Sequence, residues 1–430
     1  IFDYANGWLE NIRQIISGIE QKFNFVYDNG GRRERLKSFN GASLVTETIY
    51  GFDNASRLLE MKHLNSLSQI LEQVNYGYDA NGNRTNMNRP SVNLPTPNPV
   101  TNTSYNEANQ MLSFNDKNIV YDNNGNMTSV TNSCGTTNYT WDVRNRLVAI
   151  NGFNTDCTAL TASFKYDALG RRIEKTINGR TIQYLYDGLD IVQEIENGAV
   201  SVNYIRTLNI DEPLARIKSD GTVRYYQQDA LGSVIALTDD NGIVKTTYSY
   251  DPFGNVTISG EASDNPFQFA GRENDGTGHL FERYRYYSLD LLRYISQDPI
   301  GIAGGDVNYY VRVGNNPVNF VDPLGLAEWL RKKGDPAAMG SVNAAKGFRP
   351  NDSPMKFFEY NVPNFYETSI QHDAMLNNLG IKNAYGDSLS TIVNIVTMPI
   401  AFKYALDLNI YEDIVDTMTP IYNKIMNLCK

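Results

Sequence analysis

A short motif recurs along most of this chain and limits what the chain can fold into. An aromatic residue is followed by Asp and, three or four positions later, by Gly, Asn or Arg. Repetition at a period of roughly 25 residues indicates stacked units, because one such unit cannot bury its hydrophobic face alone. The clear copies carry Tyr27-Asp28, Phe52-Asp53, Tyr78-Asp79, Tyr121-Asp122, Trp141-Asp142, Tyr166-Asp167 and Tyr250-Asp251, with Asp229 as a weaker copy.

Each unit is expected to be a β-hairpin. Asp at the start of a tight turn binds backbone amides, and Gly three positions later tolerates a positive φ. Asn241-Gly242 is a strong hairpin signal. We therefore expect strands and no helix over residues 24–254. The proline-rich residues 89–100 are expected to form a loop between two repeat blocks. Residues 4–19 are expected to form either one helix or the ragged end of an earlier repeat.

Composition excludes several classes of protein. Lys and Arg number 38 against 48 Asp and Glu, and the net charge of −10 argues against broad binding to nucleic acid or to an anionic membrane. No apolar run is long enough to span a bilayer. Three cysteines are too few for a disulfide scaffold, so free thiols are expected rather than a bridge between Cys134 and Cys157. The chain opens at Ile1 without a leader pattern, which indicates a piece of a longer protein.

These units resemble the YD repeats of Rhs and teneurin-like proteins. The stretches that follow are similar to the Rhs-associated core: Arg285-Tyr286-Tyr287, Tyr294-Ile295-Ser296-Gln297-Asp298-Pro299-Ile300-Gly301, Gly304-Gly305-Asp306-Val307-Asn308-Tyr309-Tyr310, Asn315-Asn316-Pro317 and Asp322-Pro323-Leu324-Gly325-Leu326. The resemblance implies a mainly β fold in which a spiral of repeats forms a hollow shell and the core plugs one end. It divides the chain into a shell at 1–255, a core at 256–326 and a small, mainly α toxin domain at 327–430.

The resemblance also implies that the core cuts its own backbone after Leu326 in the manner of an aspartyl protease. Two neighbouring carboxylates that share one proton can act as base and acid on a peptide bond. We expect the pair to be Asp298 and Asp322, with Asp306 as a third candidate. The alternative is that both Asp-Pro segments are only turns, which these residue types form readily.

The last segment contains one adjacent His-Asp pair, and its surroundings resemble the short bacterial and fungal phospholipases A2. On that resemblance His372 would be the general base and Asp373 a Ca²⁺ ligand, with Asp352 in an upstream Ca²⁺-binding loop. A carboxylate that orients the histidine is expected at Asp407 or at Asp387. Ser369 and Leu376 depart from the Cys and Tyr of that family. An uncharged stretch, residues 388–402, would be either a buried core helix or a lipid-facing element.

Three functions from different classes follow from the sequence. The first is a shell that carries a Ca²⁺-dependent phospholipase-like toxin, with membrane phospholipid as substrate. Nucleic acid is not favoured, because residues 327–430 hold ten basic and eleven acidic residues and their one basic cluster, Arg331-Lys332-Lys333, is explained more simply as a solvated linker. The second is the same shell with a pore-forming or nuclease toxin, and the third is an adhesive, teneurin-like shell. Either toxin would be made in a bacterial cytoplasm, then secreted or delivered into a target cell. Its expected partners are an immunity protein and a secretion apparatus or further shell segments.

Overall fold

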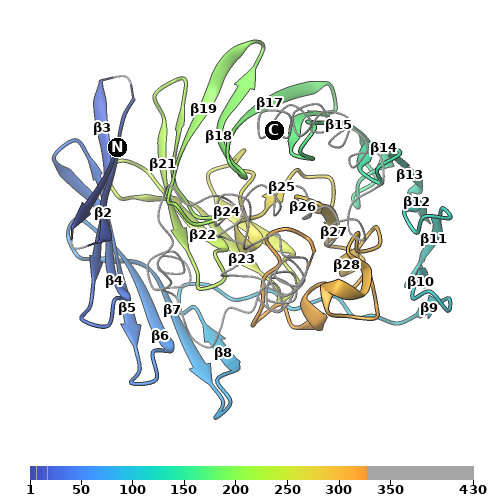
Figure 1. Cartoon of the computed structure of the whole chain (residues 1–430), viewed down its shortest axis with the longest axis horizontal. Coiled ribbons are helices and arrows are strands. Elements are labelled where there is room, and N and C mark those ends of the chain that lie inside the picture. The colour runs from blue at the N-terminus through green and yellow to red at the C-terminus, as the bar shows by residue number, and fades with distance from the viewer. Residues whose placement is uncertain (6, 17, 327–430) are drawn as a thin grey trace, which may run out of the picture. The chain divides into compact units, whose positions relative to one another are not determined.

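The computed structural model describes residues 1–5, 7–16 and 18–326, and β-strands dominate this part of the chain (Figure 1). Within each of the three sheets, consecutive strands pair antiparallel, so the order of strands in each sheet follows the order along the chain. Apart from Pro299–Ala303, the described residues fall in one compact unit. The mainly β class predicted from the sequence is confirmed.

The first sheet has eight strands and ends where the proline-rich loop begins. The helix considered for residues 4–19 is wrong, because this stretch forms strands that pair with the first repeat. The strands are β1 (Phe2–Ala5), β2 (Trp8–Ile16), β3 (Ile19–Tyr27), β4 (Arg33–Asn40), β5 (Ser43–Phe52), β6 (Leu58–Asn65), β7 (Ile70–Tyr78) and β8 (Arg84–Asn88).

The second sheet has sixteen strands and starts after the proline-rich residues, which form the predicted loop. No helix interrupts residues 24–254 in this described stretch, as the hairpin pattern predicts. The strands are β9 (Thr103–Tyr105), β10 (Met111–Phe114), β11 (Lys117–Tyr121), β12 (Met127–Asn132), β13 (Gly135–Trp141), β14 (Leu147–Phe153), β15 (Ala159–Tyr166), β16 (Arg172–Ile177), β17 (Arg180–Asp187), β18 (Asp190–Glu196), β19 (Ala199–Arg206), β20 (Pro213–Lys218), β21 (Val223–Gln228), β22 (Val234–Thr238), β23 (Val244–Tyr250) and β24 (Val256–Gly260).

A third, four-stranded sheet carries the first residues of the stretches that resemble the Rhs core, Arg285-Tyr286-Tyr287 and Tyr294. Phe281 and Tyr286 from this sheet, and Ile295 just after it, are buried with Met127 and Phe164 of the sixteen-stranded sheet. Its elements and the three short 3-10 helices near it are β25 (Glu273–Asn274), β26 (His279–Glu282), β27 (Arg285–Ser288), β28 (Arg293–Tyr294), η1 (Phe269–Gly271), η2 (Gly301–Gly304) and η3 (Val313–Asn315).

The repeat motif works by linking one hairpin to the next. Asp53 Oδ1 accepts the backbone N–H of Ala55 at 2.9 Å and that of Arg57 at 2.8 Å, while Oδ2 binds Arg57 Nε at 2.6 Å. The same guanidinium donates to the carbonyl of Asp79 at 3.1 Å and lies over the ring of Tyr78. Each arginine copy therefore binds its own turn and the aromatic residue of the following repeat. Equivalent stacking joins Arg32 to Phe52, Arg146 to Tyr166 and Arg171 to Tyr186.

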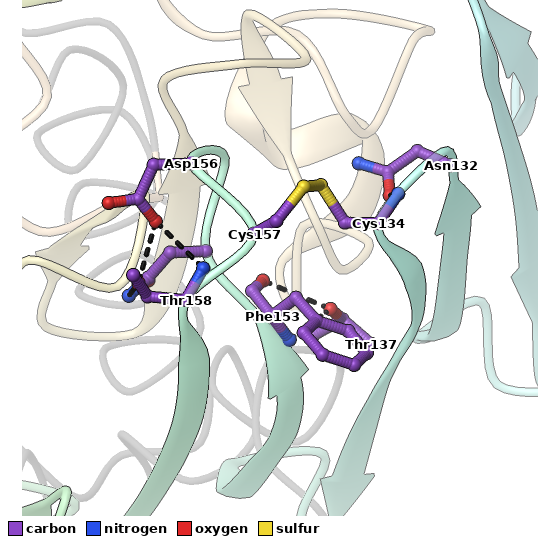
Figure 2. The surroundings of a disulfide bond; sticks show 8 residues. Asn132, Cys134, Thr137, Phe153, Asp156, Cys157 and Thr158 are labelled. Atoms are coloured by element: carbon purple, nitrogen blue, oxygen red, sulfur yellow. Dashed lines mark hydrogen bonds between the residues drawn. A yellow bond between two sulfur atoms is a disulfide. The ribbon is translucent and has the colours of Figure 1, made fainter.

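A disulfide joins two neighbouring turns of the sixteen-stranded sheet (Figure 2). Cys134 lies between β12 and β13, Cys157 lies between β14 and β15, and their Cα atoms are 5.1 Å apart. The expectation of free thiols is therefore wrong for these two residues, and Cys429 lies outside the described part. Beside the bridge, the backbone pairing of β13 with β14 ends at Asn138 and Asn151. Here the hydroxyl of Thr137 replaces it, because it accepts the N–H of Phe153 at 2.9 Å and donates to the Phe153 carbonyl at 3.1 Å.

Because the disulfide secures a strand end where regular backbone pairing has stopped, its reduction should destabilise this region. Closing a loop of this length typically contributes about 2–4 kcal/mol to the free energy of unfolding. We expect reductant to lower the urea midpoint of the native chain by the corresponding amount. A chain with both Cys134→Ser and Cys157→Ser should already have the lower midpoint and should not respond to reductant. Equal midpoints for oxidised and reduced native chain would contradict this role.

Candidate active site

The predicted aspartate pair comes together at the third sheet. Asp298 follows β28, and Asp322 lies near the end of the described residues. Arg285, the first residue of β27, bridges them, because its Nη2 lies 2.9 Å from Asp298 Oδ2 and 3.4 Å from Asp322 Oδ2. The sequence predicts the pair but not the guanidinium between its members, although Arg285 stands inside a motif that resembles the core.

Arg285 is held firmly enough to fix both carboxylates. Its Nη1 donates to the carbonyl of Tyr309 at 3.0 Å, and its Nε donates to the carbonyl of Gly325. The guanidinium carbon lies 3.6 Å from the ring centroid of Tyr294, a stacked cation–π contact. The side chain is 3% exposed. A buried, fully engaged guanidinium of this kind is a rigid element of the site.

Leu326, the predicted cleavage residue, is in contact with the pair. Its backbone N–H donates to Asp322 Oδ1 at 3.0 Å. Gly304 explains how its other end approaches Asp298. A Cβ at this position would lie 2.7 Å from Asp298 Oδ2 and 2.9 Å from the carbonyl oxygen of Leu326, so no side chain fits there. The absence of a Cβ at Gly304 leaves room for the Asp298 carboxylate and the Leu326 carbonyl oxygen beside this residue.

A second group of buried polar residues adjoins Asp322. The hydroxyl of Tyr294 lies 2.8 Å from Asp322 Oδ2 and also contacts Glu282 Oε2. Glu282 Oε1 accepts Arg312 Nε at 2.9 Å. Burial raises the pKa of Tyr294 well above its usual range, and the carboxylates of Asp322 and Glu282 raise it further. The phenol therefore keeps its proton under ordinary conditions. Tyr294 and Glu282 are functional candidates that the sequence analysis missed.

Of the remaining candidates, Asp306 makes only a turn contact, and the others lie outside the described residues. Asp306 Oδ1 accepts the backbone N–H of Asn308 at 2.8 Å, which is a turn contact. Among the described residues, no group of three or more His, Cys, Asp or Glu could hold a metal ion. No helix in the same part of the chain is long and apolar enough to cross a membrane. His372, Asp407, Asp387, Asp373 and Asp352, with the Ca²⁺ that the last two would bind, lie outside the described residues and stay predictions.

Comparison with known proteins identifies the repeat region. The Teneurin YD-shell family model matches residues 9–318. The tRNA3(Ser)-specific nuclease WapA of Bacillus spizizenii is 32% identical over 357 residues, covering 76% of this chain and 15% of that protein. The double-stranded DNA deaminase toxin A of Burkholderia cenocepacia is 28% identical over 338 residues, covering 71% and 22%. This chain thus spans less than a quarter of either relative.

A solved structure supports the same fold. The crystal structure of TcdB2-TccC3-Cdc42 matches with a TM-score of 0.56 and 19% identity, covering 76% of this chain and 20% of that one. At this level of identity the match concerns the fold alone.

The substrate expected from the sequence needs correction. A membrane phospholipid was expected and nucleic acid was not favoured, yet the two curated relatives are named for action on tRNA and on double-stranded DNA. The charge argument failed because a balanced net charge over a whole segment says nothing of a local basic site. With a family model matched over most of its length, together with the antiparallel repeat sheets, this chain belongs to the Teneurin YD-shell family.

Proposed function

We propose that this chain is part of a YD-shell toxin that cuts its own backbone between Leu326 and Ala327. One observation carries the proposal. The backbone N–H of Leu326 donates to Asp322, and the carbonyl oxygen of the same residue, which belongs to the bond to be cut, lies beside Gly304 as does Asp298. If Asp322-Pro323 served only to form a turn, there would be no reason for the distant carboxylate of Asp298 to lie near Leu326 as well.

The chemistry is hydrolysis of one amide by an acid and a base. One carboxylate removes a proton from water as the water oxygen bonds to the Leu326 carbonyl carbon, and the other carboxyl gives a proton to the carbonyl oxygen. Collapse of that intermediate breaks the bond to the Ala327 nitrogen, which leaves as an amine with the proton taken from water. The hydrogen bond from Leu326 to Asp322 and the contacts of Arg285 with both aspartates hold the reacting groups in place, which lowers the entropic cost of the step.

Residues 327–430 would then be the effector, and we assign it nucleic acid as substrate. The support is the chemistry for which the curated relatives are named, a tRNA nuclease and a double-stranded DNA deaminase. Delivery into a target cell and neutralisation by a cognate immunity protein complete the proposal. Under it the shell holds the effector until delivery.

Expression of the whole chain in bacterial cells tests the substrate. We expect loss of intact tRNA, breaks in genomic DNA or deaminated bases in its sequence soon after induction. The Asp322→Asn chain is the matched control, since its effector stays attached and the damage should be reduced. Growth arrest with intact tRNA and unaltered DNA would exclude nucleic acid as the substrate.

A further inference from the structure

The segment that leads to the proposed cut is bound by one turn of the third sheet. Residues 283–285, where β26 turns into β27, donate hydrogen bonds to three consecutive carbonyl groups of that segment. The three pairs, donor first, are Arg283 Nη1 with Pro323 at 2.6 Å, the Tyr284 N–H with Leu324 at 3.0 Å and Arg285 Nε with Gly325. The next carbonyl along the chain is that of Leu326, which belongs to the bond to be cut. The turn therefore determines where the scissile peptide begins.

Close packing of the segment against this turn fixes its register. Gly325 has a φ of +70°, and a Cβ there would lie 2.5 Å from the carbonyl oxygen of Glu282 and 3.1 Å from the backbone nitrogen of Arg285. Only glycine suits both the conformation and the space. A shift of the segment by one residue would bring the side chain of Leu324 or Leu326 to this place, so the segment has a single register on the turn.

The side chain of Arg283 is itself anchored on the sixteen-stranded sheet. Its Nη2 lies 2.8 Å from Asp211 Oδ1 and 3.2 Å from Asp190 Oδ1, and its Nη1 lies 3.1 Å from Asp211 Oδ2. Asp190 is the first residue of β18, and Asp211 lies between β19 and β20. The same Nη1 binds the carbonyl of Pro323. One guanidinium therefore connects the large sheet to the segment that is to be cut.

This anchor is charged and largely buried. The side chains of Arg283 and Asp211 are each 10% exposed, and Asp211 also pairs with Arg272. Burial opposes the charge of Asp211, but Arg272 and Arg283 hold its pKa below its usual value. Burial likewise disfavours the charge of Arg283, yet Asp211 and Asp190 hold its pKa above its usual value. Arg283 and Asp211 thus stay charged, and a guanidinium that binds a carboxylate through two nitrogen atoms has a fixed orientation.

We infer that Arg283 positions the scissile peptide and that Asp211 positions Arg283, so that self-cleavage becomes fast only once strands β18 to β20 of the large sheet have folded. The inference rests on the proposed self-cleavage and names what controls it. Arg283 is a positioning residue, because it acts through residues 323–326. Holding the peptide in one place before the reaction lowers the entropic cost of the step. The linkage also delays the cut until this part of the sheet is complete.

Substitutions at Arg283 test this role through the rate of cleavage after cell-free translation of the whole chain. Arg283→Met keeps a long side chain but removes the donor to Pro323. We expect it to slow cleavage by about 10–100-fold, the effect of losing a hydrogen bond from a charged group. Arg283→Lys keeps the charge and a donor but not the planar fork, so it should cleave at least about fivefold faster than Arg283→Met.

Arg216→Met is the matched control, because it removes a buried arginine of the same sheet that is paired elsewhere. Arg216 lies in β20, is 2% exposed and is 2.7 Å from Asp264, which follows β24. Both methionine variants should lower the urea midpoint, measured in the uncleaved Asp322→Asn background. The Arg216→Met chain should nevertheless cleave within about twofold of the native rate. Equal slowing by both variants would reflect a general loss of stability and would overturn the inference.

A double-mutant cycle tests the step from Asp211 to Arg283. Asp211→Asn should slow cleavage of the native chain by about tenfold but should hardly slow the Arg283→Met chain further, because Asp211 acts through Arg283. Effects that multiply would show that the two residues act independently, contrary to the inference. Where a variant gives no folded chain, Arg283→Lys or Asp190→Asn replaces it in the cycle, with the same expected result.

Failure of this inference differs from failure of the cleavage proposal. An Asp322→Asn chain that cleaves at the native rate would overturn the cleavage proposal itself. If Asp322→Asn abolishes cleavage but Arg283→Met cleaves at the native rate, the aspartate pair stands and the positioning role of Arg283 is wrong.

Discussion

We expect replacement of Asp298 or Asp322 with asparagine to slow the proposed self-cleavage by about 10²–10⁴-fold, because general acid–base catalysis contributes on this order and an amide can neither take nor give the proton. Each variant keeps the size of the side chain, and the amide introduced by Asp322→Asn retains an oxygen that can accept the Leu326 N–H. The measurement is the fraction of chain cleaved over time after cell-free translation. Both variants should remain as one full-length band when the native chain is already cut.

Asp306→Asn is the matched control for this experiment. Asp306 lies in the same segment of the chain, but its Oδ1 accepts a turn contact from Asn308, which asparagine preserves. Its cleavage rate should stay within about twofold of the native rate. Cleavage by the Asp298→Asn chain at the native rate would show that the pair in contact with Arg285 is not the catalytic pair.

The second large effect concerns stability. Arg33 of the eight-stranded sheet forms an ion pair with Glu212, and both side chains are 2% exposed. Thr207 and Asn209 also donate to Glu212 Oε2, each at 2.6 Å. Burial disfavours the charge of Arg33, but Glu212 raises the pKa of Arg33 above its usual value. Glu212→Ala would leave a buried, unpaired guanidinium, so we expect the free energy of unfolding to fall by about 3–5 kcal/mol.

A surface ion pair provides the comparison for that effect. Glu196 binds Arg180 at 2.8 Å, with Arg180 half exposed, and Glu196→Ala should cost at most about 1 kcal/mol. Urea unfolding of both variants in the uncleaved Asp322→Asn background keeps a single covalent chain throughout. If Glu212→Ala and Glu196→Ala lower the free energy of unfolding by similar amounts, the buried Arg33–Glu212 pair does not stabilise the contact between the two sheets.

The local fold follows from the sequence because its determinants are local. Asp28, Asp53 and their equivalents bind amides within the next four residues, so each turn can be recognised from a few positions. Cys134 and Cys157 form the exception. Their separation of 23 residues is close to one repeat, which places both at the same edge of the sheet. That spacing is a signal for the bridge that the expectation of free thiols overlooked.

Contacts between distant segments could not be predicted in the same way. Arg33 and Glu212 are 179 positions apart, and nothing in either local sequence indicates the other. The same limit applies to the candidate active site. Asp298 and Asp322 are found through the family motif, whereas the bridging role of Arg285 and the contacts of Tyr294 depend on how β27 and β28 pair. Net charge misled the choice of substrate, since it averages over surfaces that act separately.

The central claim is that this chain cuts itself at one bond through the Asp298–Asp322 pair. Mass spectrometry of the purified chain under denaturing conditions tests it most directly, with the Asp322→Asn chain measured in parallel. We predict two species for the native chain, one ending at Leu326 and one beginning at Ala327, that elute together before denaturation, and a single full-length mass for the variant. A native chain of full-length mass, or fragments that end anywhere other than Leu326, would contradict the account.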